Sequence, residues 1–177
     1  MKAVVRFFRQ RAIKSFLKKR KTCVLPDITK YPTVAVMLDA EQFKRHNEIE
    51  KTLSRFFTMK RYTFIVCCDE IPENVAKSDN FFFITKKDFD FWGLIRREEK
   101  YELLSMAFDM LVDFTKTTDE LMTNTYVMTL INNSFRVRFG TSSPAFYDLV
   151  IDTKKDDDML NQIEILYKYL SMLLGRR

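Results

Sequence analysis

The chain has 177 residues, 46% hydrophobic and 31% charged, which is the composition of one globular domain and excludes wholesale disorder. Its net charge of +6 is unevenly distributed, because nine of the 30 basic side chains and none of the 24 acidic ones lie in residues 1–22. The rest of the chain is slightly acidic, so the whole positive excess belongs to this first segment.

The first segment, VVRFFRQRAIKSFLKKRK (residues 4–21), has the pattern of a basic amphipathic helix. Its apolar side on a helical wheel consists of Val4, Val5, Phe8, Ala12 and Phe16. Charges interrupt it every two to four residues, so it resembles neither a membrane span nor the apolar core of a secretory signal. We expect residues 1–24 to form this helix and residues 25–177 to form a single α/β domain.

Apolar runs of strand length alternate with helical patterns along the remaining chain. The strands are expected at 33–38, 62–68, 80–85, 108–114, 135–140 and 147–152. The helices are expected at 40–57, 117–132 and 156–174, with room for a short one within 86–107. Uninterrupted apolar strands between helices are typical of a parallel sheet that is covered on both faces. We therefore expect a Rossmann-like three-layer sandwich with five or six mostly parallel strands.

Two local patterns add detail to this expectation. Arg136 and Arg138 alternate with apolar residues in FRVRFG (135–140), which predicts a strand with one solvated face near a sheet edge. Thr117 and Glu120 have the spacing of a capping box at the start of a helix.

Glycine and histidine are scarce, which argues against nucleotide-binding loops and zinc sites. The chain has three glycines and no glycine-rich phosphate loop, so we expect no nucleotide cofactor. His46 is the only histidine, and we expect it to be a solvated residue on a helix. No His/Cys cluster has zinc spacing, so we expect no metal. The odd number of cysteines, three, indicates a reducing compartment, and we expect a cytoplasmic protein.

Three aspartates each end or follow an apolar run: Asp39, Asp113 and Asp152. On parallel strands their carboxylates share the carboxyl edge of the sheet, where doubly wound proteins bind ligands, and such a cluster can hold Mg²⁺. Asp69 is a further candidate for the same edge. The alternative is that each aspartate caps the following helix or turn. We favour the caps, because the sequence supplies no matching base, nucleophile or phosphate cradle.

The segment KKDFDFWGLIRR (86–97) places three aromatic side chains between basic pairs. Phe89, Phe91 and Trp92 are candidates for stacking on bases or for contact with a protein partner. The alternative is that these rings fold back onto the domain.

The basic segment itself is the strongest candidate for a binding site. A basic helix can bind nucleic acid, lie on anionic lipid, or cover its own domain. Nine cations without an opposing acid repel one another unless a polyanion relieves them, so we favour an external partner. The expected contacts with that partner are Arg6, Arg9, Arg11, Lys14, Lys18, Lys19, Arg20 and Lys21.

Two resemblances to known families add to this interpretation. Residues 108–140 (FDMLVDF…FRVRFG) resemble the strand–helix–strand unit in the N-terminal half of GT-B heptosyltransferases, which implies the fold. That family's donor-binding second domain has no counterpart here, so sugar transfer is not expected. FFFITKKDFDFWG (81–93) and YDLVIDT (147–153), together with the basic start, resemble a family of small uncharacterised bacterial proteins, which implies no activity.

We therefore expect a non-catalytic binding or accessory protein that docks through its basic helix on RNA or a ribosome-like particle. One alternative is a peripheral protein of the inner-membrane surface that uses the same helix. The other is a small enzyme that uses Asp39, Asp113 and Asp152.

Overall fold

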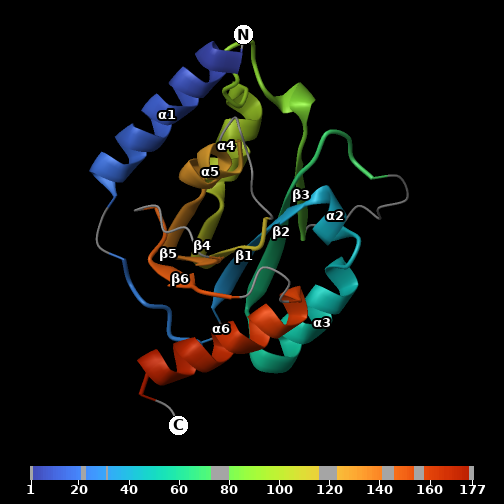
Figure 1. The fold of residues 1–177 in the computed structure, drawn as a ribbon, viewed down its shortest axis with the longest axis vertical. Coiled ribbons are helices and arrows are strands. Elements are labelled where there is room, and N and C mark those ends of the chain that lie inside the picture. The colour runs from blue at the N-terminus through green and yellow to red at the C-terminus, as the bar shows by residue number, and fades with distance from the viewer. Residues whose placement is uncertain are drawn as a thin grey trace.

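Six parallel strands form one sheet at the centre of the molecule (Figure 1). The computed structural model describes residues 2–20, 23–30, 32–72, 80–115, 123–140, 146–153 and 158–175. The strands are β1 (Thr33–Asp39), β2 (Arg61–Cys67), β3 (Phe81–Ile84), β4 (Ala107–Asp113), β5 (Asn132–Phe139) and β6 (Leu149–Ile151). Their order is β3-β2-β1-β4-β5-β6, which is the doubly wound order of Rossmann-like folds and confirms the expected fold class.

Helices cover both faces of this sheet. They are α1 (Lys2–Lys19), α2 (Ala40–Phe43), α3 (His46–Phe56), α4 (Arg97–Ser105), α5 (Thr123–Leu130) and α6 (Met159–Leu173), with a 3₁₀ turn at Lys86–Asp88. Helices α2, α3 and α6 pack on one face and α1, α4 and α5 on the other (Figure 1). Helix α1 therefore belongs to the same layer as α4 and α5.

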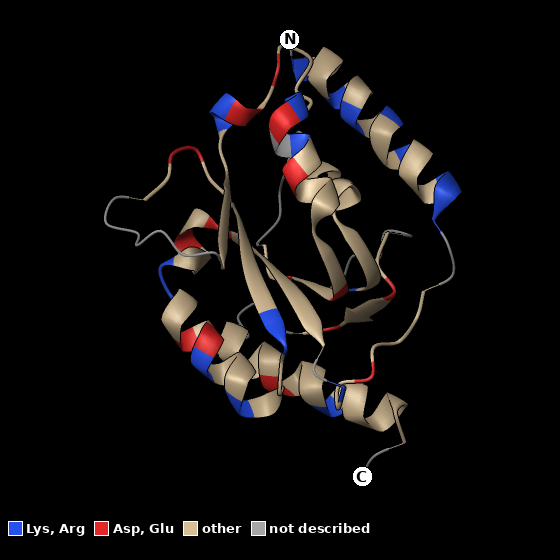
Figure 2. Cartoon of the chain, turned by 180° about the vertical axis from the view of Figure 1, so that it is seen from behind, with Lys and Arg blue, Asp and Glu red and all other residues tan. Residues whose placement is uncertain are grey.

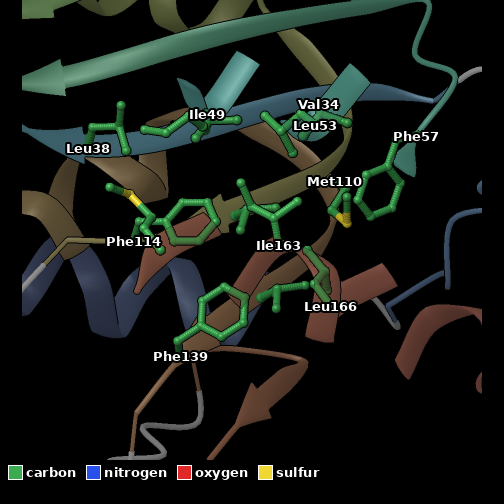
Figure 3. Packing of buried hydrophobic residues seen from close by; sticks show 14 of the residues in the cluster. Val34, Leu38, Ile49, Leu53, Phe57, Met110, Phe114, Phe139, Ile163 and Leu166 are labelled. Atoms are coloured by element: carbon green, nitrogen blue, oxygen red, sulfur yellow. The ribbon is translucent and has the colours of Figure 1, made fainter. Parts of the chain in front are cut away.

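The central strand β1 is apolar from Val34 to Leu38 because both of its faces are buried. On β1, Val34 and Leu38 face the α3/α6 layer, while Met37 faces the α1/α4/α5 layer. Figure 3 shows the first of these cores, where Ile49 of α3 and Ile163 of α6 meet the strands. Both residues have no exposed surface, so neither can be truncated without leaving a cavity.

Two expected helices have different bounds in the structure. The helix expected at 40–57 is two helices, because α2 ends after Phe43 and α3 begins at His46. Of the helix expected at 117–132, the structure describes α5 alone, and the predicted capping box of Thr117 and Glu120 lies outside the described residues. A short helix, α4, does fall within 86–107.

The expected solvated face of β5 is wrong. Arg136 is 1% exposed, and its guanidinium lies between the rings of Phe16 and Phe146, 4.3 and 4.4 Å from their centroids. Arg138 is also mostly buried. The reason is that Phe16 of α1 and Phe146 cover this face of β5, so alternation of charged and apolar residues does not mark a solvent-facing strand here.

Candidate functional site

The three predicted aspartates lie at the carboxyl edge of the sheet, because their strands are parallel. Asp39 ends β1, Asp113 ends β4, and Asp152 follows the last residue of β6. They do not form one cluster, since β1 and β6 are three strands apart, about 14 Å at the usual strand spacing. Within the described ranges, no three His, Cys, Asp or Glu side chains come together in a way that could hold a metal ion.

The carboxylate of Asp39 caps the helix that follows it. Its oxygen accepts a hydrogen bond from the backbone N–H of Gln42 at 3.0 Å, and the Gln42 side chain accepts one from the Asp39 N–H. The Gln42 side chain also donates to the carbonyl of Phe114, beyond the end of β4. The opening between β1 and β4, where doubly wound folds bind ligands, is therefore bridged by the protein's own side chain.

The carboxylate of Asp113 is also used internally. It is 1% exposed and accepts hydrogen bonds from the Tyr147 hydroxyl at 2.5 Å and from the Thr115 N–H and hydroxyl at 2.9 and 2.7 Å. Burial, followed by the neighbouring Asp113 charge, raises the pKa of Tyr147, so this phenol remains a donor at neutral pH. The pair stabilises the fold around β4 and presents no reactive oxygen to solvent.

His46 is half-buried, whereas the sequence pattern predicted a solvated residue. Its ring stacks on Phe43, with centroids 4.6 Å apart, and meets the ring of Phe81 edge-on. The Nδ1 atom lies 2.9 Å from the carbonyl of Phe43. These contacts make it part of the packing between α2, α3 and β3.

The second predicted site is the basic helix, and one of its cations is buried beneath it. Arg9 is 4% exposed and donates from Nε to the carbonyl of Gly93 at 2.7 Å and from Nη1 to the Thr123 hydroxyl at 2.5 Å. Its guanidinium lies 4.7 Å from the ring centroid of Phe89. The expectation that Arg9 faces a partner is therefore wrong, because it fixes α1 to the domain.

Arg20 fixes the other end of the same helix. Its guanidinium donates to the carbonyl of Phe146 at 2.7 Å and forms an ion pair with the carboxylate of Asp148. The Arg20 side chain is 16% exposed, so it too is held against the domain rather than offered to a partner. Between these two anchors, Ile13 is buried in the core of the α4/α5 layer.

The side of α1 that contacts the domain includes most of the predicted apolar stripe, because Ala12 and Phe16 pack on the core of this layer and Phe8 contacts Trp92. Arg9 and Ile13 are its fully buried residues, whereas Val4, which was assigned to the stripe, is 42% exposed. Phe7 is 58% exposed on the outer side. The helix is thus present as expected, but its apolar and basic residues are not divided cleanly between two faces.

Five of the other described cations of α1 form an outward surface, which we call the basic face: Arg6, Arg11, Lys14, Lys18 and Lys19; Lys2, at the start of the helix, is not counted in it. All five are exposed, and within the described part of the chain none of them pairs with a carboxylate. Figure 2 shows this helix with blue segments along its length and no red one. Lys21, the last predicted contact, lies outside the described residues.

The predicted aromatic segment divides into one buried and two exposed rings. Phe89 is half-buried and packs on the core of the α4/α5 layer, so for this residue the alternative of folding back is correct. Phe91 and Trp92 are 71% and 47% exposed. Trp92 contacts Phe8 of α1 with ring centroids 5.1 Å apart, which places the turn beside the first half of the helix.

Sequence reasoning missed one residue of this surface, Phe7. On the helical wheel Phe7 interrupted the pattern of basic residues, and this irregularity was the signal that could have found it. Its ring lies 5.5 Å from that of Phe8, so it extends the exposed aromatic surface from the turn onto α1.

The chain belongs to a family of unknown function (DUF6913), whose model matches residues 6–173 and therefore includes most of α1 as well as the sheet. Neither a curated protein nor a solved structure matches the chain. In the part of the chain that the structure describes, no helix is both long enough and apolar enough to cross a membrane.

Proposed function

We propose that this protein is a non-catalytic binding or accessory protein that docks on a phosphate-bearing anionic partner through the basic face of α1. The observation that carries the proposal is that two cations at this helix bind the domain while five others face outward. Arg9 and Arg20 are hydrogen-bonded to the domain, and the five residues of the basic face are exposed without carboxylate partners among the described residues. The helix is thus held in one orientation with its free charges outward.

Electrostatics explains why such a surface favours a partner. A solvated helix ordinarily mixes acids among its exposed bases, which reduces self-repulsion. Helix α1 has no acid at all, and the exposed cations Lys14, Lys18 and Lys19 follow one another within two turns. Binding a polyanion removes this repulsion and releases condensed counterions, which gives affinity without sequence specificity.

The carboxyl edge of the sheet supports a binding protein more than an enzyme. The oxygens of Asp39 and Asp113 accept hydrogen bonds from neighbouring groups of the protein, and Gln42 bridges the opening between their strands. Asp152 is exposed but lies three strands from Asp39. The local resemblance of residues 108–140 to heptosyltransferases bears on the fold and brings no sugar transfer to this proposal.

The partner in this proposal is RNA or a ribosome-like particle, or else an anionic membrane surface, and we place the protein in the cytoplasm of a bacterium. Both partners present phosphate groups at high density, and the basic face fits either. The exposed aromatic rings beside α1, Phe91 and Trp92, favour the membrane surface, because such side chains prefer the boundary between headgroups and acyl chains.

A charge-reversal variant tests the proposal. We expect the variant Arg6→Glu, Arg11→Glu, Lys14→Glu and Lys18→Glu to fold normally, because all four side chains are exposed. It should lose retention on heparin and binding to a fluorescent oligouridine. The matched control carries four reversals on the opposite helical layer, where the residues are equally exposed. These are Lys44→Glu, Lys51→Glu, Arg55→Glu and Lys60→Glu.

The two variants have the same net charge, so the comparison separates the location of the charge from its amount. For single-stranded RNA, removing four phosphate contacts should lower the slope of log affinity against log salt concentration by about 3. The control should keep the slope and the affinity of the wild type within a few fold. Equal losses in the two variants, or no loss in the α1 variant, would mean that the basic face is only a solvated surface.

A further inference from the structure

An exposed aromatic cluster lies at the first half of α1, and it belongs to two segments far apart in the sequence. We call it the aromatic tip and define it as Phe7 and Phe8 of α1 with Phe91 and Trp92 of the following turn. The rings form a chain: the centroids are 5.5 Å apart for Phe7 and Phe8, 5.1 Å for Phe8 and Trp92, and 5.3 Å for Phe91 and Trp92. Large apolar side chains gathered in this way on a surface mark an interaction site.

The turn that carries Phe91 and Trp92 is held rigidly. One carboxylate oxygen of Asp90 accepts hydrogen bonds from the N–H groups of Trp92 and Leu94, both at 2.9 Å. Gly93 has φ +74°, a left-handed conformation that suits glycine, and its N–H donates to the Asp90 carbonyl at 2.9 Å. Arg9 then ties the Gly93 carbonyl to α1. The exposed rings are therefore fixed relative to the helix and are not a loose loop.

The aromatic tip adjoins the basic face. Arg6 and Arg11 are exposed on the turns of α1 before and after Phe7 and Phe8, and Val4, 42% exposed, adds apolar surface at the same end. Asp90 is the acid of the turn, and its carboxylate is used by the two N–H groups that it caps. Apolar rings beside an excess of cations over acids complement a surface that is negative outside and apolar beneath.

From this juxtaposition we infer that the partner is an anionic lipid bilayer, with the aromatic tip entering the boundary between headgroups and acyl chains. Trp and Phe are the side chains that favour this boundary, and lysine and arginine bind the anionic headgroups around it. The inference rests on the proposed function, which it narrows from any phosphate-bearing partner to a membrane surface.

The arrangement of the rings argues against bases as the partner. A base stacks on the free face of an aromatic side chain. Trp92, however, is already contacted by Phe8 at an interplanar angle of 63° and by Phe91 at 84°, both edge-to-face arrangements. The rings lie against one another and do not stand apart as separate platforms for successive bases, an arrangement that suits an apolar medium better than stacked nucleotides.

Trp92 is the only tryptophan of the chain, so its fluorescence reports directly on the aromatic tip. We expect vesicles of phosphatidylglycerol mixed with phosphatidylcholine to shift its emission to shorter wavelength. Brominated acyl chains should quench it. Vesicles of phosphatidylcholine alone should do neither at the same lipid concentration, because binding needs the basic face as well as the rings.

Substitution of the most exposed rings gives the second arm of the test. We expect Phe7→Ser with Phe91→Ser to weaken vesicle binding at least tenfold and to leave retention on heparin unchanged. Phe91→Ser alone should show part of this loss, and at 71% exposed it removes little packing. The matched control is Met172→Ser with Leu173→Ser, which removes apolar side chains of 62% and 55% exposure at the end of α6.

The outcomes separate this inference from the proposed function. If the protein binds oligouridine through the basic face and Trp92 emission does not change with anionic vesicles, the membrane inference is overturned and nucleic acid is the partner. If vesicles bind equally well with and without Phe7 and Phe91, the aromatic tip does not insert and the inference is also overturned. If neither oligouridine nor anionic vesicles bind, both the inference and the proposed function fail.

Discussion

Arg9→Met is the sharpest test of how α1 is held on the domain. Methionine keeps an unbranched apolar stem of similar reach and removes the guanidinium, so the change addresses the polar interactions and leaves most of the packing. The substitution removes, among other interactions, a hydrogen bond to the Gly93 carbonyl, one to the Thr123 hydroxyl, and the stacking of the cation over Phe89.

The expected cost is about 3 kcal/mol in the free energy of unfolding. Each hydrogen bond to a charged group contributes about 1.5–3 kcal/mol, and the cation–π interaction adds about 0.5–2 kcal/mol. Burying the uncharged stem in place of a cation that is 4% exposed offsets part of this loss, because the desolvation penalty of the charge disappears. For a domain of this size, the melting temperature should fall by about 6–12 °C.

Urea denaturation followed by circular dichroism measures the change, with Arg11→Met as the matched control two positions away. Arg11 is exposed, so its replacement should alter stability by no more than about 0.5 kcal/mol. If Arg9→Met were no less stable than Arg11→Met, the buried guanidinium would not be what holds the helix, and the assignment of Arg9 to the domain side would be refuted.

Two further substitutions test the turn at Gly93 and the dependence of stability on acidic pH. Gly93→Ala should lower the free energy of unfolding, measured in urea, by more than about 1–2 kcal/mol, because φ is +74° and the new Cβ would lie 2.3 Å from Cγ1 of Val5. Adding Val5→Ala should recover the stability lost to this steric clash but not the stability lost to the left-handed backbone conformation. The pKa of Asp158 is lowered by its hydrogen bond from Arg45, so the stability from this pair is complete above the unfolded value near 4 and is lost as the pH falls below it. We therefore expect Asp158→Asn to flatten the loss of stability between about pH 4 and 2, by a small amount because the side chains are half exposed, and an unchanged slope would contradict the assignment.

The central strand β1 could be predicted from the sequence because it is buried on both faces. Val34, Val36 and Leu38 face one core and Ala35 and Met37 the other, so the run contains no polar position and its length matches a strand. The parallel arrangement also follows from the alternation of strands and helices, whereas the strand order does not, because doubly wound folds occur with more than one order. The position of a strand depends on residues that are adjacent in the sequence, so the sequence pattern alone predicts it.

The orientation of α1 could not be predicted, because it depends on groups far away in the chain. In sequence, Arg9 differs little from Arg6 or Arg11, and groups far along the chain, such as the carbonyl of Gly93 and the hydroxyl of Thr123, receive its buried guanidinium. The same reason applies to Arg136, which alternation assigned to solvent and which the ring of Phe16 covers. A cation is buried where the fold supplies acceptors and rings around it, and the local sequence pattern does not identify those groups.

The carboxylates were predicted only in part. Their common edge follows from parallel strands, but their use as internal acceptors depends on partners such as Tyr147. For Asp39 a local signal existed, because Asp39 and Gln42 have the spacing of a capping box, and the structure shows both of its hydrogen bonds.

The long-range anchors of α1 also set the order in which the protein can be completed during synthesis. Helix α1 is made before the strands of the sheet, and Arg20 must wait for Asp148, which follows 128 residues later. At about 5–20 residues per second, this interval is about 6–26 seconds. Early in this interval, before Gly93 and Trp92 are made, the nascent chain contains the basic segment with Val5 and Phe8 but without the groups that these two residues later contact. Such a segment emerges beside ribosomal RNA and near any membrane at which translation occurs, so α1 meets anionic surfaces before it meets its own sheet.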